Sequence, residues 1–165
     1  MKICLSGPDG SGKTTIAKIL AKLARQEGIE VRVSWMRGTH TLASLFARLL
    51  KRLGFSGNAN PYYKIFIPPS LYWLWWFLEF ISMIPIWIIR YVFPRNVIGD
   101  RCLVDFVVWV AATTDVKFLQ SVWARAAFAL IRKYVVIYLY APPRILEQRR
   151  SGPLPPNLPL MYALY

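Results

Sequence analysis

The most constraining feature of this chain is a glycine-rich string near its N-terminus, Gly7-Pro8-Asp9-Gly10-Ser11-Gly12-Lys13-Thr14. It matches the pattern G-x-x-x-x-G-K-[S/T], which requires a strand before it and a helix after it. A short apolar run over 2–6 precedes the string, and apolar residues at helical spacing follow over 14–26. The sequence therefore predicts a strand, a tight loop and a helix in direct succession.

The residue types in this string suit the binding of phosphate groups. Glycines let the backbone curl until successive N–H groups face an anion, and the start of the following helix adds partial positive charge. In such a P-loop, Lys13 neutralises the β- and γ-phosphates and the Thr14 hydroxyl ligates magnesium. We therefore expect ATP and Mg²⁺ as cofactors. The predicted phosphate-binding residues are Gly7, Pro8, Asp9, Gly10, Ser11, Gly12, Lys13, Thr14 and Thr15.

The rest of the chain alternates between strand-like and helix-like segments. Further strands are predicted at 29–35, 96–99 and 134–139, and the last is apolar enough to be expected in the interior. Helices are predicted at 41–53, in the aromatic-rich segment, at 103–113, at 116–131 and from 143. This alternation predicts an α/β fold with a parallel sheet of four to five strands, covered by helices on both faces.

No linker divides the 165 residues, so we expect residues 1–165 to form a single domain. Within it, Ser151 to Tyr165 is expected to be a lid-like or irregular tail, because this segment is rich in proline. Cys4 and Cys102 stand in apolar runs without metal-ligand spacing, so they are interpreted as small core residues in a reducing compartment. The lack of a long apolar leader after Met1 predicts a cytoplasmic protein.

Charge and hydrophobicity narrow the range of partners. Lys+Arg 21 against Asp+Glu 8 gives a net charge of +13, which favours anionic ligands such as nucleotides or acidic lipid, without predicting specific nucleic-acid binding. The aromatic-rich segment has charge-free runs shorter than the roughly 18 residues of a spanning helix, and Glu79 and Pro85 interrupt it. We therefore predict a homodimer through the helix around Leu71 to Tyr91, with membrane-surface contact as the alternative.

Three segments together resemble thymidylate kinases, a branch of the nucleoside monophosphate kinases. The string GPDGSGKTT at 7–15 resembles the P-loop of that family. Val97-Ile98-Gly99-Asp100-Arg101 is similar to its strand ending in Asp-Arg, with Cys102 where the family has tyrosine or histidine. YLYAPPRILEQRR at 138–150 is similar to the segment leading into its arginine-bearing lid. The resemblance implies a P-loop kinase fold and phosphoryl transfer from ATP to a nucleoside monophosphate, most simply dTMP to dTDP.

The resemblance also implies which residues bind the acceptor. Asp9 lies four residues before the lysine, where the family has an acidic residue that faces the acceptor nucleotide. Arg37 follows the second strand, where the family has an arginine that grips the acceptor monophosphate. Asp105 completes an Asp-Arg-x-x-x-Asp pattern that begins at Asp100 and Arg101. These five residues are the predicted substrate-binding set.

For catalysis, the resemblance implies Lys13, Arg101 and Arg149 as the cations that offset charge on the transferring phosphoryl group. Thr14 and Asp100 are the predicted magnesium ligands. Positioning and electrostatics dominate such a transfer, so no general base is expected.

The chain departs from the family in some places. Its tail has no arginine or lysine, and Tyr140 replaces the aspartate usual in that segment. The resemblance covers about four-fifths of a typical member, without the elements that hold adenine. Two alternatives follow. One is a P-loop kinase for a nucleoside or other small hydroxyl acceptor, with Asp9 or Asp105 as a base. The other is a non-catalytic nucleotide-binding protein at a membrane surface.

Overall fold

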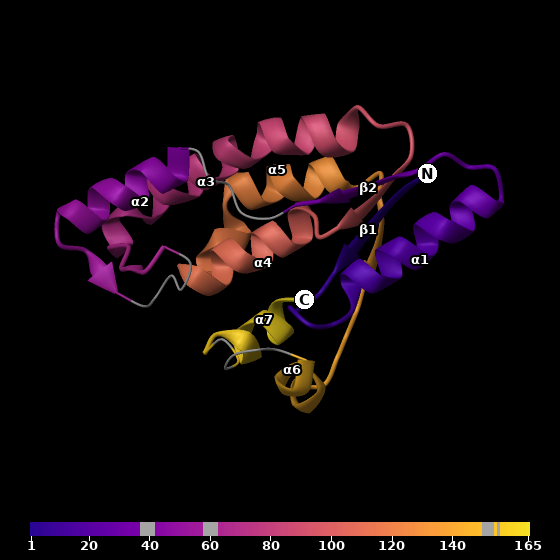
Figure 1. The fold of residues 1–165 in the computed structure, drawn as a ribbon. Coiled ribbons are helices and arrows are strands. Elements are labelled where there is room, and N and C mark those ends of the chain that lie inside the picture. The colour runs from indigo at the N-terminus through magenta and orange to yellow at the C-terminus, as the bar shows by residue number, and fades with distance from the viewer. Residues whose placement is uncertain (37–41, 58–62, 150–153, 155) are drawn as a thin grey trace.

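A computed structural model describes residues 1–36, 42–57, 63–149, 154 and 156–165. Its strands form one parallel sheet of order β2-β4-β1-β5 (Figure 1). The strands are β1 (Lys2–Ser6), β2 (Arg32–Trp35), β4 (Val97–Asp100) and β5 (Val135–Tyr138). The prediction of an α/β fold with a parallel sheet of four to five strands is confirmed.

Helices follow the strands along the chain. They are α1 (Lys13–Gln26), α2 (Leu42–Arg52), α3 (Tyr72–Trp87), α4 (Leu103–Thr113), α5 (Val122–Ile131), α6 (Pro143–Arg149) and α7 (Leu158–Leu164). Short 3-10 helices, Pro69–Leu71 and Val116–Gln120, precede α3 and α5, and a π-helix, Ile88–Val92, follows α3.

Two helical segments differ from their predictions. The helix expected over 116–131 is divided, because the Ser121 hydroxyl caps α5 by accepting a hydrogen bond from the Ala124 N–H. The tail expected to be irregular contains α7, since Leu158 is buried in a small cluster with Ala141 and Leu146. The packing of Leu158 against these residues therefore holds the short helix α7 against the chain that follows β5.

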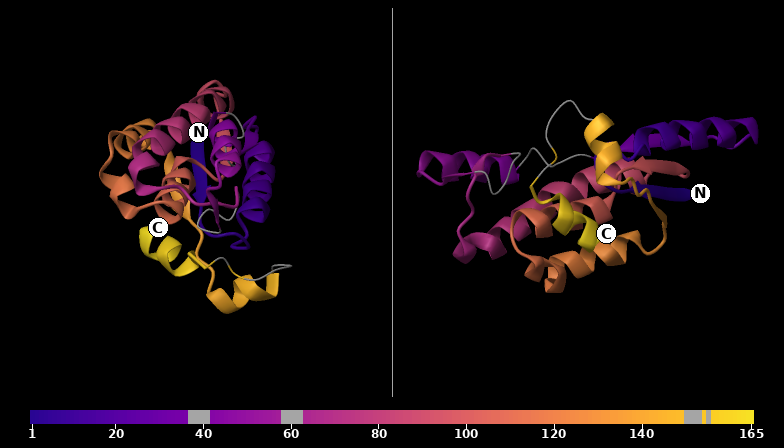
Figure 2. Two further views of the ribbon diagram at one scale, coloured as in Figure 1. Left: turned by 90° about the vertical axis from the view of Figure 1, so that its left-hand side faces the viewer. Right: turned by 90° about the horizontal axis from the view of Figure 1, so that it is seen from below.

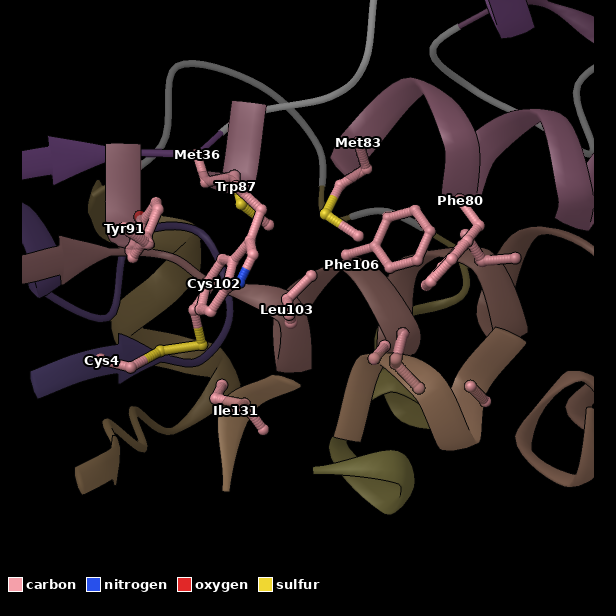
Figure 3. Close-up of a cluster of buried hydrophobic side chains, with 14 of the residues drawn as sticks. Cys4, Met36, Phe80, Met83, Trp87, Tyr91, Cys102, Leu103, Phe106 and Ile131 are labelled. Atoms are coloured by element: carbon pink, nitrogen blue, oxygen red, sulfur yellow. A yellow bond between two sulfur atoms is a disulfide. The ribbon is translucent and has the colours of Figure 1, made fainter. Parts of the chain in front are cut away.

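The two faces of the sheet are covered differently (Figures 1 and 2). On one face, Leu5 and Ile98 pack against the buried alanines of α1, whose small side chains allow a close approach. On the other face, α3, α4 and α5 build the largest core, in which Trp87, Leu103 and Phe106 are buried (Figure 3). The P-loop emerges between these layers, at the carboxyl end of β1.

Cys4 and Cys102 are both fully buried in this core, but they are joined in a disulfide (Figure 3). The interpretation of two separate core residues is therefore wrong. The bond joins β1, the strand before the P-loop, to the residue that immediately precedes α4. Their 98-residue separation in sequence hid the pairing.

Strand β5 is also different from its prediction. All four of its side chains are exposed, so the expectation of a buried strand at 134–139 is wrong. β5 is an edge strand, and α6 and α7 lie beyond its carboxyl end rather than along its faces (Figure 1). Helices therefore cover both faces of the sheet at its centre but leave β5 open to solvent.

The aromatic segment forms a continuous helical stretch, Pro69–Val92, that Glu79 and Pro85 do not interrupt. By length and composition alone it could cross a membrane, a test that core helices of soluble proteins also pass. One side of α3 is buried in the protein, including Trp75 and Glu79, while Trp73 is largely exposed. Trp75 is thus a core residue and not part of a surface available to a partner.

Tyr91 connects this helical stretch to the strand that leads into the site. Its ring packs on Gly99, where a Cβ would lie 2.5 Å from the ring. Its hydroxyl donates a hydrogen bond to the Arg101 carbonyl oxygen at 2.6 Å and also lies 3.2 Å from the carbonyl oxygen of Ser34. Burial, aided by the charges of Asp105 and Asp100, raises the pKa of Tyr91 well above its ordinary value.

Stability is therefore expected to fall in alkali. The unfolded state loses its tyrosine protons above about pH 10 while folded Tyr91 keeps its own, so the associated stability is full below that pH and is lost above it, by about 1.4 kcal/mol per pH unit. Tyr91→Phe should flatten this decline and cost about 1–3 kcal/mol at neutral pH. Urea unfolding across a pH series measures both effects, and the exposed Tyr140→Phe is the control. Equal alkaline slopes for the Tyr91 variant and wild type would contradict the assignment.

Candidate functional site

The loop between β1 and α1 has the backbone that the glycine-rich string predicts. Gly7, Gly10 and Gly12 have φ angles of 141°, 90° and 92°, in a region that other residues rarely adopt. Gly7 is also constrained by space, because a Cβ there would collide with the carbonyl oxygen of Leu139. Gly12 directly precedes α1, so the loop curls into the N-terminus of that helix.

Lys13 is nearly buried within this loop. Its Nζ donates hydrogen bonds to the carbonyl oxygens of Gly7 and Pro8, both at 2.7 Å. Burial lowers the pKa of Lys13 from its ordinary value, and the nearby Asp105 and Asp100 carboxylates oppose this shift. The ammonium is therefore held inside the loop by groups that phosphate oxygens can replace.

Thr14, in the first turn of α1, meets Asp100 at the end of β4. The Thr14 hydroxyl donates a hydrogen bond to Asp100 Oδ2 at 2.5 Å. Asp100 ends β4, which pairs with β1, and it is almost completely buried. A hydroxyl and a carboxylate suit Mg²⁺, which binds proteins through one or two carboxylates and takes its other ligands from phosphates and water. The described residues contain no cluster of three or more His, Cys, Asp or Glu side chains that could hold a metal ion.

Arg101 adopts an unusual backbone conformation just after β4. Its φ of 75° lies in the left-handed region, which costs a non-glycine residue about 1–3 kcal/mol. The peptide is fixed there because its N–H donates to the Leu5 carbonyl oxygen at 3.0 Å. Its guanidinium forms an ion pair with the Asp9 carboxylate. Arg101 is thus held in a strained backbone conformation while its side chain contacts the P-loop.

These groups line one cavity of about 600 Å³. Arg149 reaches it from α6, and its Nη1 donates to the Gly10 carbonyl oxygen at 3.3 Å. The structure therefore brings Lys13, Arg101 and Arg149 together. The lining residues are Asp9, Gly10, Ser11, Gly12, Lys13, Thr14, Thr15, Ile16, Trp35, Asp100, Arg101 and Arg149.

Asp105 lies behind the loop and is absent from the described cavity lining. It is buried in the first turn of α4, where its carboxylate accepts hydrogen bonds from the N–H groups of Gly7 (3.2 Å) and Cys102 (2.9 Å). The Tyr165 hydroxyl donates a third bond to it at 2.8 Å. Asp105 therefore fixes the P-loop to α4, and its predicted role toward the acceptor stays a prediction.

Arg37 lies outside the described residues, so its predicted contact with the acceptor stays a prediction. The neighbouring Met36 N–H donates to the Asp100 carbonyl oxygen at 3.2 Å. The chain therefore leaves β2 beside the end of β4.

Trp35 is a cavity residue that motif analysis missed. It pairs in register with Asp100, so both side chains lie on the same face of the sheet. The Arg90 guanidinium donates a hydrogen bond to its carbonyl oxygen. Trp35 ends β2, and ligands of open parallel sheets bind at the carboxyl ends of strands, which is the signal that could have found it.

The comparison with protein families fits this geometry. Residues 3–61 match the ATPase family associated with various cellular activities (AAA), a range that runs from β1 through the P-loop and α1 to beyond α2. The chain has the P-loop NTPase fold. The P-loop assignment and nucleotide binding are thereby supported at the level of the P-loop ATPase superfamily, whose members bind ATP, typically with Mg²⁺, and are generally enzymes. The match does not support the thymidylate kinase branch in particular, and no curated protein matches the chain.

Proposed function

We propose that this P-loop protein transfers the γ-phosphoryl group of ATP to a nucleoside monophosphate, with dTMP as the first acceptor to test because of the resemblance. The observation that carries the proposal is the convergence of Lys13, Arg101 and Arg149 on one cavity beside the Thr14–Asp100 pair. Three cations around a transferring phosphoryl group suit a reaction in which charge stabilisation supplies most of the rate.

The roles follow from the contacts. Thr14 and Asp100 would hold magnesium, which neutralises charge on the β- and γ-phosphates when it is bound. Lys13 would exchange its bonds with the Gly7 and Pro8 carbonyls for bonds with phosphate oxygens. An acceptor oxygen bonds to the γ-phosphorus as the bond to the β-phosphate oxygen breaks, and ADP leaves. An ionised acceptor phosphate needs no base, which fits a site whose carboxylates are already paired.

The position of Trp35 supports a nucleotide as the proposed acceptor. In the sheet order, β4 separates β2 from β1, and strands lie about 4.8 Å apart. The Trp35 backbone is therefore roughly 10 Å across the sheet from the strand that carries the P-loop. An indole in this position could stack on a base, a contact worth about 1–3 kcal/mol. A nucleotide acceptor accounts for this aromatic residue better than a small sugar does.

Simple ATP hydrolysis is the second candidate, favoured by the match to an ATPase family. Hydrolysis requires a group that orients water. The structure describes every acidic residue of the chain, and only Asp9, Asp100 and Asp105 lie at the site. Their carboxylates are engaged by Arg101, by Thr14 and by the N–H groups of Gly7 and Cys102, respectively. Since each of these carboxylates already has a partner, we favour transfer to an acceptor over hydrolysis that uses a carboxylate to orient water.

The test is ADP release from Mg-ATP with a panel of monophosphates and nucleosides, with Arg37→Ala beside wild type. We expect a monophosphate to stimulate release. We expect Arg37→Ala to raise the acceptor KM by about tenfold or more, as for a lost charged hydrogen bond, with little change in ATP affinity. Arg32→Ala, at the other end of β2, is the control. Stimulation by an unphosphorylated acceptor alone would reject the substrate class, and release unaffected by any acceptor would favour hydrolysis.

We also propose that the exposed side of α3 mediates a homodimer. Trp73 and Ile81 are exposed there, whereas Trp75 is buried. Charged substitutions meant to disrupt the dimer therefore belong at Trp73 and Ile81, because a charge at Trp75 would unfold the chain. Sedimentation without detergent at micromolar concentration tests the proposal, and a monodisperse wild-type monomer would reject it.

A further inference from the structure

The segment that contains α2 has an unusual charge pattern. Between Glu30 and Glu79 the sequence has no acidic residue, although it includes six basic ones. Three of these six, Arg48, Lys51 and Arg52, lie on α2 and are exposed. This part of the molecule therefore presents uncompensated positive charge.

Helix α2 also exposes a line of leucines. Its inner side is buried through Ala43, Ala47 and Leu50, which belong to a cluster that includes Trp75 of α3. The exposed leucines are Leu42, Leu45 and Leu49 of α2 and Leu53 immediately after it, whose N–H still donates to the Leu49 carbonyl oxygen, and they are between 45% and 64% accessible. Their spacing of three, four and four residues places them along one side of the helix. We call these four residues the leucine stripe.

The basic residues flank the leucine stripe. Arg48 and Arg52 each follow a stripe leucine by three residues, so they lie beside it on the helix surface. Lys51 lies further round the polar side. A helix with leucines on one side and cations along the border has the residue pattern of helices that lie in the interface of a bilayer.

The position of α2 makes this surface accessible. In two views α2 lies at one end of the elongated molecule, and α1 lies at the other (Figures 1 and 2). It packs against α3 and against Ile65 and Ile67, and the P-loop is in the middle of the molecule. The surface can therefore be occupied without covering the cavity at the P-loop.

We propose that the leucine stripe and its flanking cations dock on an anionic lipid surface. The leucines enter the headgroup region while the long basic side chains reach lipid phosphates. Each cation near the surface increases the affinity for anionic lipid by about fivefold. A second copy of α2 is a poor occupant because the same cations would face one another. Nucleic acid would engage the cations but leave the leucine stripe in water.

The test is flotation of the whole chain with vesicles of phosphatidylcholine alone and of an equimolar mixture with phosphatidylglycerol. One variant, Arg48→Gln with Arg52→Gln, removes flanking charge, and a second, Leu45→Ser with Leu49→Ser, removes exposed apolar surface. Helix α1 supplies matched controls, because it also exposes basic and aliphatic residues: Lys18→Gln with Lys22→Gln, and Ile19→Ser with Leu23→Ser. Circular dichroism establishes that each variant is folded.

We expect wild type to float with the anionic vesicles and much less with the neutral ones. The charge variant should lose about 10- to 30-fold in partitioning, the leucine variant should lose at least as much, and the α1 controls should stay within about twofold of wild type. Equal flotation with neutral vesicles, or retention by the leucine variant, would overturn the proposal. Equal losses in the α1 controls would overturn it as well. The readout is independent of phosphoryl transfer.

Discussion

Lys13→Ala is expected to lower phosphoryl transfer by at least about 10²- to 10³-fold, the loss found when one preorganised charge-stabilising group is removed from a site. Folding should change much less. The Lys13 ammonium is already desolvated in the free protein, so its removal relieves that cost while it removes two hydrogen bonds with loop carbonyls. ATP binding should also weaken, because a cation that contacts the phosphates is lost. Single-turnover transfer, calorimetric ATP titration and urea unfolding measure the effects on rate, ATP binding and stability.

Lys13→Arg tests whether positive charge alone is enough at this position. It keeps the charge, but the larger planar group does not fit between the Gly7 and Pro8 carbonyls as the ammonium does. We expect it to recover part of ATP binding and little of the rate. Full activity in the alanine variant would show that phosphates bind elsewhere, and the P-loop assignment would then fail.

Asp105→Ala is expected to have the second largest effect, and it should act on both stability and ATP binding. It leaves the buried N–H groups of Gly7 and Cys102 without their acceptor, at about 1–3 kcal/mol for each. We therefore expect a loss of roughly 2–5 kcal/mol in the free energy of unfolding. ATP should bind more weakly because Gly7 begins the phosphate-binding loop.

Tyr165→Phe distinguishes the bond that Asp105 accepts from Tyr165 from the bonds that it accepts from the backbone. It removes one donor to the carboxylate and leaves both backbone bonds in place, so its effect should be about 1 kcal/mol. Urea unfolding and ATP titration compare the variants. If Asp105→Ala left both unchanged and raised only the acceptor KM, the residue would contact the acceptor, as the resemblance implies.

The local parts of this architecture could be predicted from sequence. The strand, loop and helix around Lys13 have strong local signals, because glycine spacing and apolar periodicity act within a few residues. The short strand that carries Asp100 was also predictable, since its apolar residues end at a charged pair. That strand and β1 lie side by side, as the general rule for alternating strands and helices implies.

The features that sequence reasoning missed depend on distant contacts. An apolar strand such as β5 looks the same whether helices cover it or not, because coverage depends on where later helices pack. The role of Trp35 depends on its register with Asp100, which motif spacing does not contain. Tyr165 reaches Asp105 only through the fold, and no local pattern marks that contact.

The disulfide between Cys4 and Cys102 closes the chain from residue 4 to residue 102 into a covalent ring. The two ends of this ring lie in β1, which leads into the P-loop, and immediately before α4, which carries Asp105. Closing a ring of roughly a hundred residues removes conformational freedom from the unfolded chain, worth about 4.7 kcal/mol in the chain-entropy treatment. Because this effect acts on the unfolded chain, it makes unfolding of the protein and loss of the cavity less favourable. Part of the molecule's resistance to unfolding is therefore set by the thiol–disulfide balance of its surroundings, which reductants can shift without touching a single residue that binds phosphate.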